Sequence, residues 1–439
     1  MKDIRPRGTS TGPKRSNANR RVRRYKTSFH VPATYVLSFL LLAVFPLSSA
    51  AADSHHPLPL SDTSSLTVLI CLDGVPLDMI QDLRKEGFFR SFHKPAPLIS
   101  TFPAITEVML TEFFHVPYAP GYGLRYYDKK QNRLVGGISS ADAVSIWFEL
   151  YDFITPMIDR GMVYLWGRWA WKDIDMVERA LARLDTGVFL AHIDSTDALL
   201  HHERPKVAHR WLKKFSVMID TFVQTHPNAE VFLFSDHGNE RIPTRRVPVE
   251  RYLKKAGWHP KGVIEGESGV AILPTGLIST GYLYTRYKRK VARELAWRKG
   301  IELTAYEESG VITVFSKKGE ARIQRKVVEG RPWYLYEPVI GDPLRYDTFL
   351  WRAIDSGWTD SMGYIPARRW FAGTLEERYP YAVDRLYGGL TGHVLNVGDV
   401  LLSLEPGWHL GSAFLSFFFH FQGTHGSLRR GSITGFAMA

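Results

Sequence analysis

The chain has 439 residues and a single cysteine, Cys71. One thiol cannot form an intrachain disulfide, and it cannot build a zinc site from several thiolates. Internal repeats are also missing, as is a phosphate-binding loop of the GxxxxGK[ST] type. Disorder is excluded in turn, because 45% of the residues are hydrophobic, with 25 Phe and 12 Trp among them. What remains is a large globular chain that holds any metal through oxygen and nitrogen ligands.

The net charge is small beyond the N-terminus, although the whole chain has a formal net charge of +12. Residues Met1 to His30 contain ten basic side chains and one acidic side chain, which gives this segment +9. Residues 31–52 carry no charge, so the remaining 387 residues carry only +3. This distribution argues against nucleic acid as the main partner.

The N-terminal segment has the order of a secretory signal. A basic run is followed by the apolar stretch Tyr35–Leu47 and then by small residues that end at Ala52. We therefore expect residues 1–52 to be a signal peptide cleaved after Ala50 or Ala52, or an outward-facing membrane anchor if it is not cleaved. In both cases the rest of the chain is exported, to the periplasm or the extracellular space. We expect no other membrane span.

After a polar tether over residues 53–65, the sequence predicts an α/β fold. Three short, continuous apolar runs are typical of buried strands: Leu66–Leu72, Gly187–Ile193 and Glu230–Phe234. Helical patterns separate them, and the pattern over Pro205–Gln224 repeats large apolar residues at helical spacing. This alternation predicts a mostly parallel central sheet covered by helices on both faces.

The pattern changes downstream, where Arg345–Tyr381 has no clear period. We expect residues 282–390 to form an inserted α+β cap on a core made of residues 66–281 and 391–439. The hairpin strands of the cap are predicted over Gly310–Ser316, Ala321–Val328 and Trp333–Glu337.

Polar side chains follow the predicted buried strands. The carboxyl ends of parallel strands meet at one edge of a sheet, where ligands bind. Carboxylates and imidazoles at this edge are the oxygen and nitrogen ligands that suit zinc. The candidates are Asp73 after the first strand, Asp197, His201 and His202 after the second, Asp236 and His237 after the third, and His425 near the C-terminus.

The spacing of these residues strengthens the metal hypothesis. Asp197 and His201 are four residues apart, which places them on one face of a helix. Asp236 and His237 are adjacent, so both can serve one site only where the backbone turns sharply, as Gly238 permits. Each pattern alone is common in ordinary turns and solvated helices, and their occurrence at successive strand ends is what favours a site. His202 leaves the choice of histidine open.

A threonine is the candidate nucleophile. Residues 100–108 look like a loop that enters a helix, with Thr101 close to the N-cap and Pro103 in the first turn. A threonine hydroxyl at this place can lose its proton when it coordinates zinc, and the helix N-terminus stabilises a phosphate. Thr106 is the alternative nucleophile.

Together these motifs resemble the alkaline phosphatase superfamily, nearest its type I phosphodiesterase/nucleotide pyrophosphatase branch. The resemblance covers about Leu66–Arg430, in the motifs LICLDG, STFPA, DALLHH with SDHG, and GTHG. It implies an alkaline phosphatase-like core with two zinc ions, or other divalent ions. The implied ligands are Asp73, Asp236, His237 and the nucleophile Thr101 for the first ion, and Asp197, His201 and His425 for the second.

The chain departs from the pattern of that branch at three positions. Leu200 replaces the Gly before the histidine of the second site, and Ala104 replaces the Asn after T-F-P. A later phosphate-binding Asn corresponds to Leu124 or Arg125. An Arg at this position could bind phosphate by a bidentate contact, and it would suit a substrate other than a nucleotide.

The resemblance implies an exported, metal-dependent hydrolase that cleaves a small phosphate ester through a phosphothreonine intermediate. Whether the substrate is a monoester or a diester stays open, because the cap surrounds the non-reacting oxygens. One alternative is a phosphoryl or phosphoethanolamine transferase of the same fold. A second alternative is a catalytically inactive exported binding protein, which the retention of all six ligand positions opposes.

Overall fold

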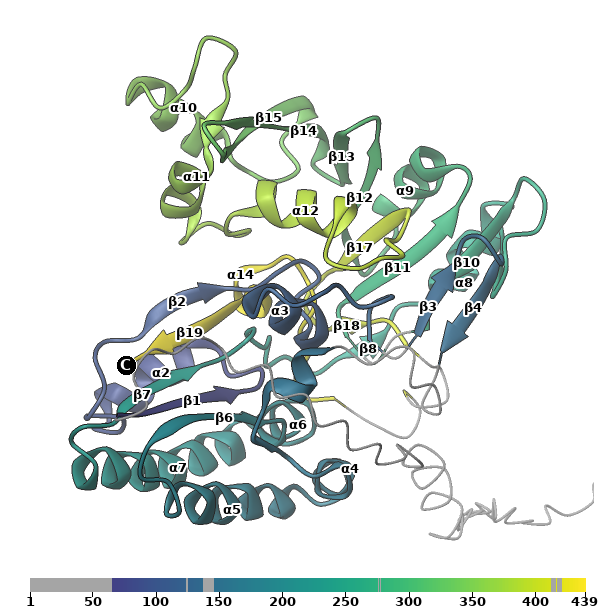
Figure 1. The fold of residues 1–439 in the computed structure, drawn as a ribbon. Helices are drawn as coiled ribbons and strands as arrows, with labels where there is room; N and C mark the ends of the chain where they lie inside the picture. Colours follow the sequence, from purple (N-terminus) through teal and green to yellow (C-terminus); the bar gives the residue numbers. More distant parts are fainter. Residues whose placement is uncertain are drawn as a thin grey trace, which may run out of the picture. The chain divides into compact units, whose positions relative to one another are not determined.

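A six-stranded sheet with the order β2–β19–β7–β1–β6–β5 lies at the centre of the fold (Figure 1). Strands β7, β1, β6 and β5 run parallel, whereas β19 is antiparallel to both of its neighbours. The predicted α/β class with a mostly parallel central sheet is confirmed. The strands span β1 (Leu66–Leu72), β2 (Ala96–Ile99), β5 (Phe153–Ile154), β6 (Gly187–Ile193), β7 (Glu230–Phe234) and β19 (Thr434–Met438).

The computed structural model describes residues 65–123, 125–136, 146–274, 276, 278–411, 416 and 421–439. All of them belong to one compact unit, Val44–Ala439. The predicted signal or anchor lies outside the described residues, and so does the tether except for Ser65. None of the helices in the described part of the chain combines the length and the apolar composition that a bilayer crossing requires.

Helices cover both faces of the central sheet. On one face, Val68 and Ile70 of β1 share a core with apolar residues of α2 (Leu77–Lys85), α5 (Trp171–Leu181), α6 (Ser195–His202) and α7 (Pro205–Thr225). On the other face, Cys71 packs with Leu110 of α3 (Thr106–Phe113) and with Trp147 of the 3-10 helix Ile146–Leu150. α4 (Met157–Leu165) precedes α5. α2 ends at Lys85, and the backbone then turns through Gly87 at a φ of +100°.

A second sheet has nine strands in the order β16–β15–β14–β13–β12–β17–β11–β10–β9. One of its faces packs against α8 (Val249–Lys255) and α9 (Lys288–Ala296), and the other against α10 (Asp347–Asp355), α11 (Ala367–Thr374) and α12 (Ala382–Thr391). Its strands span β9 (His259–Lys261), β10 (Gly269–Ile272), β11 (Thr280–Thr285), β12 (Ile301–Glu308), β13 (Val311–Ser316), β14 (Gly319–Val328), β15 (Arg331–Gly341), β16 (Ile365–Pro366) and β17 (Val400–Leu404).

This sheet is wider than the cap predicted over residues 282–390. Strands β9, β10 and β17 come from outside that range, and β17 lies between β11 and β12 with antiparallel pairing on both sides. Pairing between strands that are distant in the sequence therefore joins the predicted cap to the flanking segments. Shorter elements complete the fold: the hairpin of β3 (Arg125–Asp128) and β4 (Arg133–Gly136), the parallel pair of β8 (Arg245–Arg246) and β18 (Trp408–His409), and α14 (Arg430–Ile433).

The packing of α7 gives a test of the core. Trp211 is fully buried, stacks on Phe215 with ring centroids 5.3 Å apart and donates from Nε1 to the Ala170 carbonyl at 2.7 Å. We expect Trp211→Ala to lower the free energy of unfolding by about 3–5 kcal/mol, because it leaves a cavity. Urea unfolding followed by circular dichroism measures the loss.

The matched control lies on the same helix. Val217 is 60% exposed, so Val217→Ala should change the free energy of unfolding by less than about 0.5 kcal/mol. Equal effects of the two substitutions would contradict the placement of α7.

Candidate metal centre

The carboxyl ends of the adjacent strands β1 and β7 bring together the first predicted ligand group. His237 Nε2 lies 3.4 Å from Asp73 Oδ1 and 3.4 Å from Asp236 Oδ2. Potential ligand atoms of the three residues all lie within 4.8 Å of one another, and all three side chains are buried. Two carboxylates and one imidazole therefore converge as a cation site requires.

The second group assembles beside the first. Asp197 and His201 share one face of α6, with His201 Nε2 3.2 Å from Asp197 Oδ2. His425 Nε2 lies 3.8 Å from Asp197 Oδ1. The ring of His425 stacks on that of His237, with centroids 3.9 Å apart, and these two histidines and Asp197 place ligand atoms within 4.8 Å of one another. His237 thus lies between the two groups.

Backbone carbonyls fix the orientation of the three imidazoles. The Nδ1 atoms of His201, His237 and His425 lie 2.9, 2.9 and 2.7 Å from the carbonyl oxygens of Gly423, Gly238 and Ala104, respectively. A carbonyl oxygen can only accept, so each Nδ1 carries the proton. Each Nε2 then faces the carboxylates, and it is the atom that a bound metal would use.

The electrostatics of the cluster fit divalent cations. Burial, then the charges of Asp236 and Asp197, raise the pKa of Asp73 well above its usual range. Burial, reinforced by His237, lowers the pKa of His425 to about 3, so its imidazole is neutral. Two buried carboxylate oxygens, Asp197 Oδ1 and Asp236 Oδ2, form no hydrogen bond with any described residue. A bound cation would satisfy these oxygens and relieve the repulsion.

Of the two candidate threonines, the geometry favours Thr106. Thr106 is the first residue of α3, and its Oγ1 lies 3.4 Å from both carboxylate oxygens of Asp73 and 3.4 Å from His237 Nε2. Thr101 is fully buried, and its hydroxyl donates to the Pro103 carbonyl at 3.0 Å. The structure thus brings Thr106, not Thr101, into contact with the first ligand group.

The remaining predicted residues take different places. His201 points into the cluster, whereas the ring of His202 packs 4.6 Å from that of Phe421, which favours His201 as the ligand. Arg125 begins the β3–β4 hairpin, is exposed, and forms no ion pair or hydrogen bond with any described residue. Its role in substrate binding stays a prediction.

A third group, around His192, was missed by the sequence analysis. His192 Nε2 lies 3.3 Å from Asp73 Oδ2, and its Nδ1 lies 3.6 Å from Asp194 Oδ1. His192 is the penultimate residue of β6 and is buried behind Asp73. Only the pairing of β6 with β1, which sets His192 opposite Cys71, could have shown this contact.

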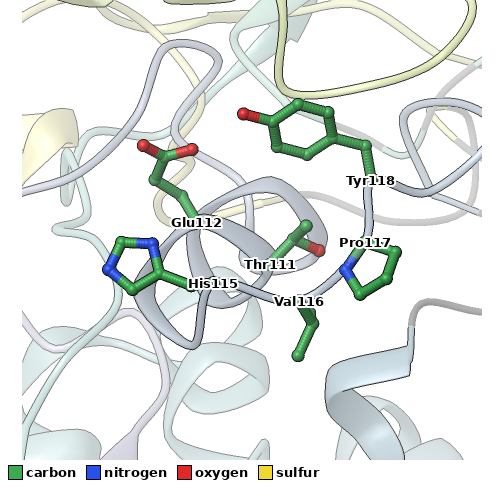
Figure 2. A pocket seen from close by; sticks show the side chains of 6 residues that line it. All are labelled: Thr111, Glu112, His115, Val116, Pro117 and Tyr118. Atoms are coloured by element: carbon green, nitrogen blue, oxygen red, sulfur yellow. The ribbon is translucent and has the colours of Figure 1, made fainter.

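A cavity on the surface lies apart from this cluster. A surface cavity of about 400 Å³ lies around the far end of α3 (Figure 2), where Glu112 pairs with His393 Nδ1 at 3.2 Å. The first of its lining residues, Thr111, lies five residues along α3 from Thr106, a rise of about 7.5 Å. None of the predicted site residues lines it. Its lining residues are Thr111, Glu112, His115, Val116, Pro117 and Tyr118.

No protein-family model matches the chain, and no curated protein matches it in sequence. Solved structures with partial similarity include phosphonoacetate hydrolase from Sinorhizobium meliloti 1021 in complex with phosphonoformate, which is 12% identical over 86% of this chain and 90% of that chain, with a TM-score of 0.47. Murine ectonucleotide pyrophosphatase/phosphodiesterase 5 is 10% identical over 85% of this chain and 87% of that chain, with a TM-score of 0.44. At these values the likenesses carry no argument about activity.

Gly74 gives a test of the cluster geometry. It follows Asp73 at a φ of +69°, and a Cβ atom there would lie 2.6 Å from Asp197 Oδ1. We expect Gly74→Ala to displace the Asp197 carboxylate and to weaken zinc binding about 10- to 100-fold. Competitive zinc titration with a fluorescent chelator measures this change.

Gly357 supplies the matched control. It also has a positive φ, of +63°, but no atom lies within 4 Å of its added Cβ. Gly357→Ala carries the same kind of backbone strain and should leave zinc affinity unchanged. If both variants bind zinc like the wild type, Asp197 does not hold a metal at this position.

Proposed function

We propose that the chain is an exported, metal-dependent hydrolase of phosphate esters in which Thr106 is the nucleophile. The observation that carries this proposal is the contact of the Thr106 hydroxyl with Asp73 and His237, at the first residue of a helix and within a group of buried carboxylates and imidazoles. A hydroxyl oriented in this way is the arrangement that phosphoryl transfer to an enzyme side chain needs.

The two ligand groups would hold two divalent cations, which we propose to be Zn²⁺. Asp73, Asp236 and His237 would hold the first ion, and the second would lie on Asp197, His201 and His425. When bound, such ions lower the pKa of a coordinated hydroxyl and neutralise charge on a transferring phosphoryl group.

The residues of the chain itself orient the reaction. Contacts with Asp73 and His237 hold the Thr106 oxygen, and the N-terminus of α3 favours the negative phosphate placed beside it. Attack on phosphorus forms the bond to Thr106 Oγ1 and breaks the bond to the leaving oxygen. Water then hydrolyses the phosphothreonine and restores the hydroxyl.

The substrate would be a small phosphate ester, and the N-terminal segment would direct export or attach the chain to a membrane. A transferase of the same fold would need an acceptor alcohol in place of water. A binding protein would retain the ligand residues without turnover.

The choice of nucleophile is tested by exchanging the two threonines separately. We expect Thr106→Ala to lower kcat on an aryl phosphate ester by at least about 10³-fold while both zinc ions stay bound. Thr106→Ser should keep measurable turnover, because it retains the hydroxyl. Steady-state kinetics together with metal analysis of each purified variant measure these effects.

Thr101→Ala is the control for Thr106→Ala. It removes a buried hydroxyl that donates to the Pro103 carbonyl, so some stability is lost but turnover should remain. Loss of turnover in Thr101→Ala with full activity in Thr106→Ala would reverse the assignment.

The reaction class is tested with the zinc-loaded protein. We expect turnover of an aryl phosphate monoester or of a bis-aryl phosphate diester, loss of turnover after chelation and recovery when zinc is restored. Elemental analysis should find about two zinc ions per chain. Bound zinc without turnover of either ester would favour the binding protein, and turnover that requires an added alcohol would favour the transferase.

A further inference from the structure

Helices α8 and α9 carry a concentration of basic charge that the proposed function does not use. Residues 286–299, which include α9, contain seven basic side chains and one acidic side chain. α8 adds three basic side chains and one acidic side chain. Together these two segments carry +8, although residues 53–439 as a whole carry only +3. The charge is therefore local to this part of the molecule.

The two helices lie side by side on one face of the nine-stranded sheet (Figure 1). Leu253 of α8 and Leu295 of α9 enter the same core, and Tyr252 donates from its hydroxyl to the Lys299 carbonyl at 3.1 Å. The opposite side of each helix consequently faces solvent. On α9 this outward side carries Lys290 and Arg293, and Trp297 follows as the C-cap residue; the three recur at helical spacing and are all exposed.

Most of the outward cations are not neutralised by neighbouring carboxylates. Glu294 pairs with Arg298 and Glu250 pairs with Arg246, so the acidic side chains of the two helices are already engaged. Lys288 and Arg289 pair with Glu307 and Glu320 of the sheet. The exposed basic side chains at positions 251, 255, 286, 290 and 293 form no ion pair with any described residue. We define the basic surface as these exposed side chains together with Trp297: Arg251, Lys255, Arg286, Lys290, Arg293 and Trp297.

We propose that the basic surface docks on the anionic headgroups of a phospholipid membrane. Unpaired cations on one face are attracted to an anionic leaflet. Trp297 stands among them with 59% of its surface exposed, and an indole ring is suited to headgroup depth because it has an apolar body and a polar edge. A nucleic-acid surface would more typically present several aromatic rings for stacking or a helix that fits a groove.

The single cysteine allows a test that is specific to this surface. Cys71 is buried, so a second cysteine introduced on the surface can be labelled selectively in the full-length chain. Trp297→Cys would carry a polarity-sensitive fluorophore, and Val217→Cys on α7, which is 60% exposed, would carry the same label as a control. The N-terminal basic segment contributes equally to both proteins.

We expect a blue shift at position 297 with vesicles of phosphatidylglycerol and phosphatidylcholine, and none with phosphatidylcholine alone. Position 217 should show no shift with either vesicle. Each basic side chain at an anionic leaflet strengthens binding about fivefold. In the protein labelled at position 297, the further substitutions Lys290→Gln and Arg293→Gln should therefore raise the lipid concentration needed for half of the shift about 25-fold.

Arg179→Gln with Arg183→Gln removes the same charge from exposed positions at and just beyond the end of α5, and it should leave the shift unchanged. A label at position 297 that stays in water with the anionic vesicles would overturn the proposal. Equal shifts at positions 297 and 217 would also overturn it. A stronger response at position 297 to double-stranded DNA than to vesicles would assign the surface to nucleic acid and reject the lipid.

Discussion

The site depends on the convergence of buried carboxylates at one edge of a parallel sheet. Burial raises the pKa of Asp73, and the charges of Asp236, Asp197 and Asp194 raise it further, since little water remains to screen them. At short range in a medium of low polarity, this repulsion is a substantial cost of folding. Such a cluster is tolerated where cations, protons or hydrogen-bond donors compensate it. The chain supplies a donor to one of these oxygens, the Gly74 amide to Asp236 Oδ1, whereas Asp197 Oδ1 and Asp236 Oδ2 accept no hydrogen bond from any described residue.

The imidazoles link this cluster to the rest of the fold. His201 and His425 are held through the carbonyls of Gly423 and Ala104, which come from segments far apart in the sequence. The carbonyl of His425 in turn accepts from the Ser279 amide at 2.7 Å, one residue before β11 of the second sheet. The position of the His425 imidazole therefore depends on the loop before α3 and on the nine-stranded sheet together. Because both contacts are made by one residue, a shift of the loop or of the nine-stranded sheet would also move the imidazole in the site.

The sequence was sufficient for features set by local pattern and insufficient for those set by distant pairing. The strand over Leu66–Leu72 has the predicted bounds. A short, continuous apolar run that ends at Asp-Gly is compatible with few structures other than a buried strand. The cap boundary at Leu390 could not be placed, since β17 takes its position from the pairing with β11 and β12. In Arg345–Tyr381, the helices α10 and α11 pack aromatic residues such as Phe349 and Trp370 against each other, so no simple periodicity was visible.

The choice between the two threonines shows the same limit at the site. Both residues lie in one short segment, and the sequence predicted that Thr101, not Thr106, lies close to the start of the helix. The helix begins at Thr106, and this boundary alone decides which hydroxyl contacts Asp73. Helix boundaries are the least certain part of any assignment from sequence, because the first turn depends on the packing around it. Residue type and motif could therefore predict a threonine nucleophile, but they could not decide which threonine supplies the hydroxyl.

The net charge of a chain says little about its binding sites until the charged residues are placed in the structure. The basic surface of α8 and α9 carries more positive charge than residues 53–439 as a whole, so the remainder of that part of the chain is acidic on balance. The carboxylates of the cluster lie in this remainder. A phosphate ester would be repelled by these side chains alone, and α3 contributes only the partial charge of a helix end. In the proposed function, affinity for the phosphate ester would therefore come mainly from the cations, so metal binding and substrate binding would be one coupled equilibrium.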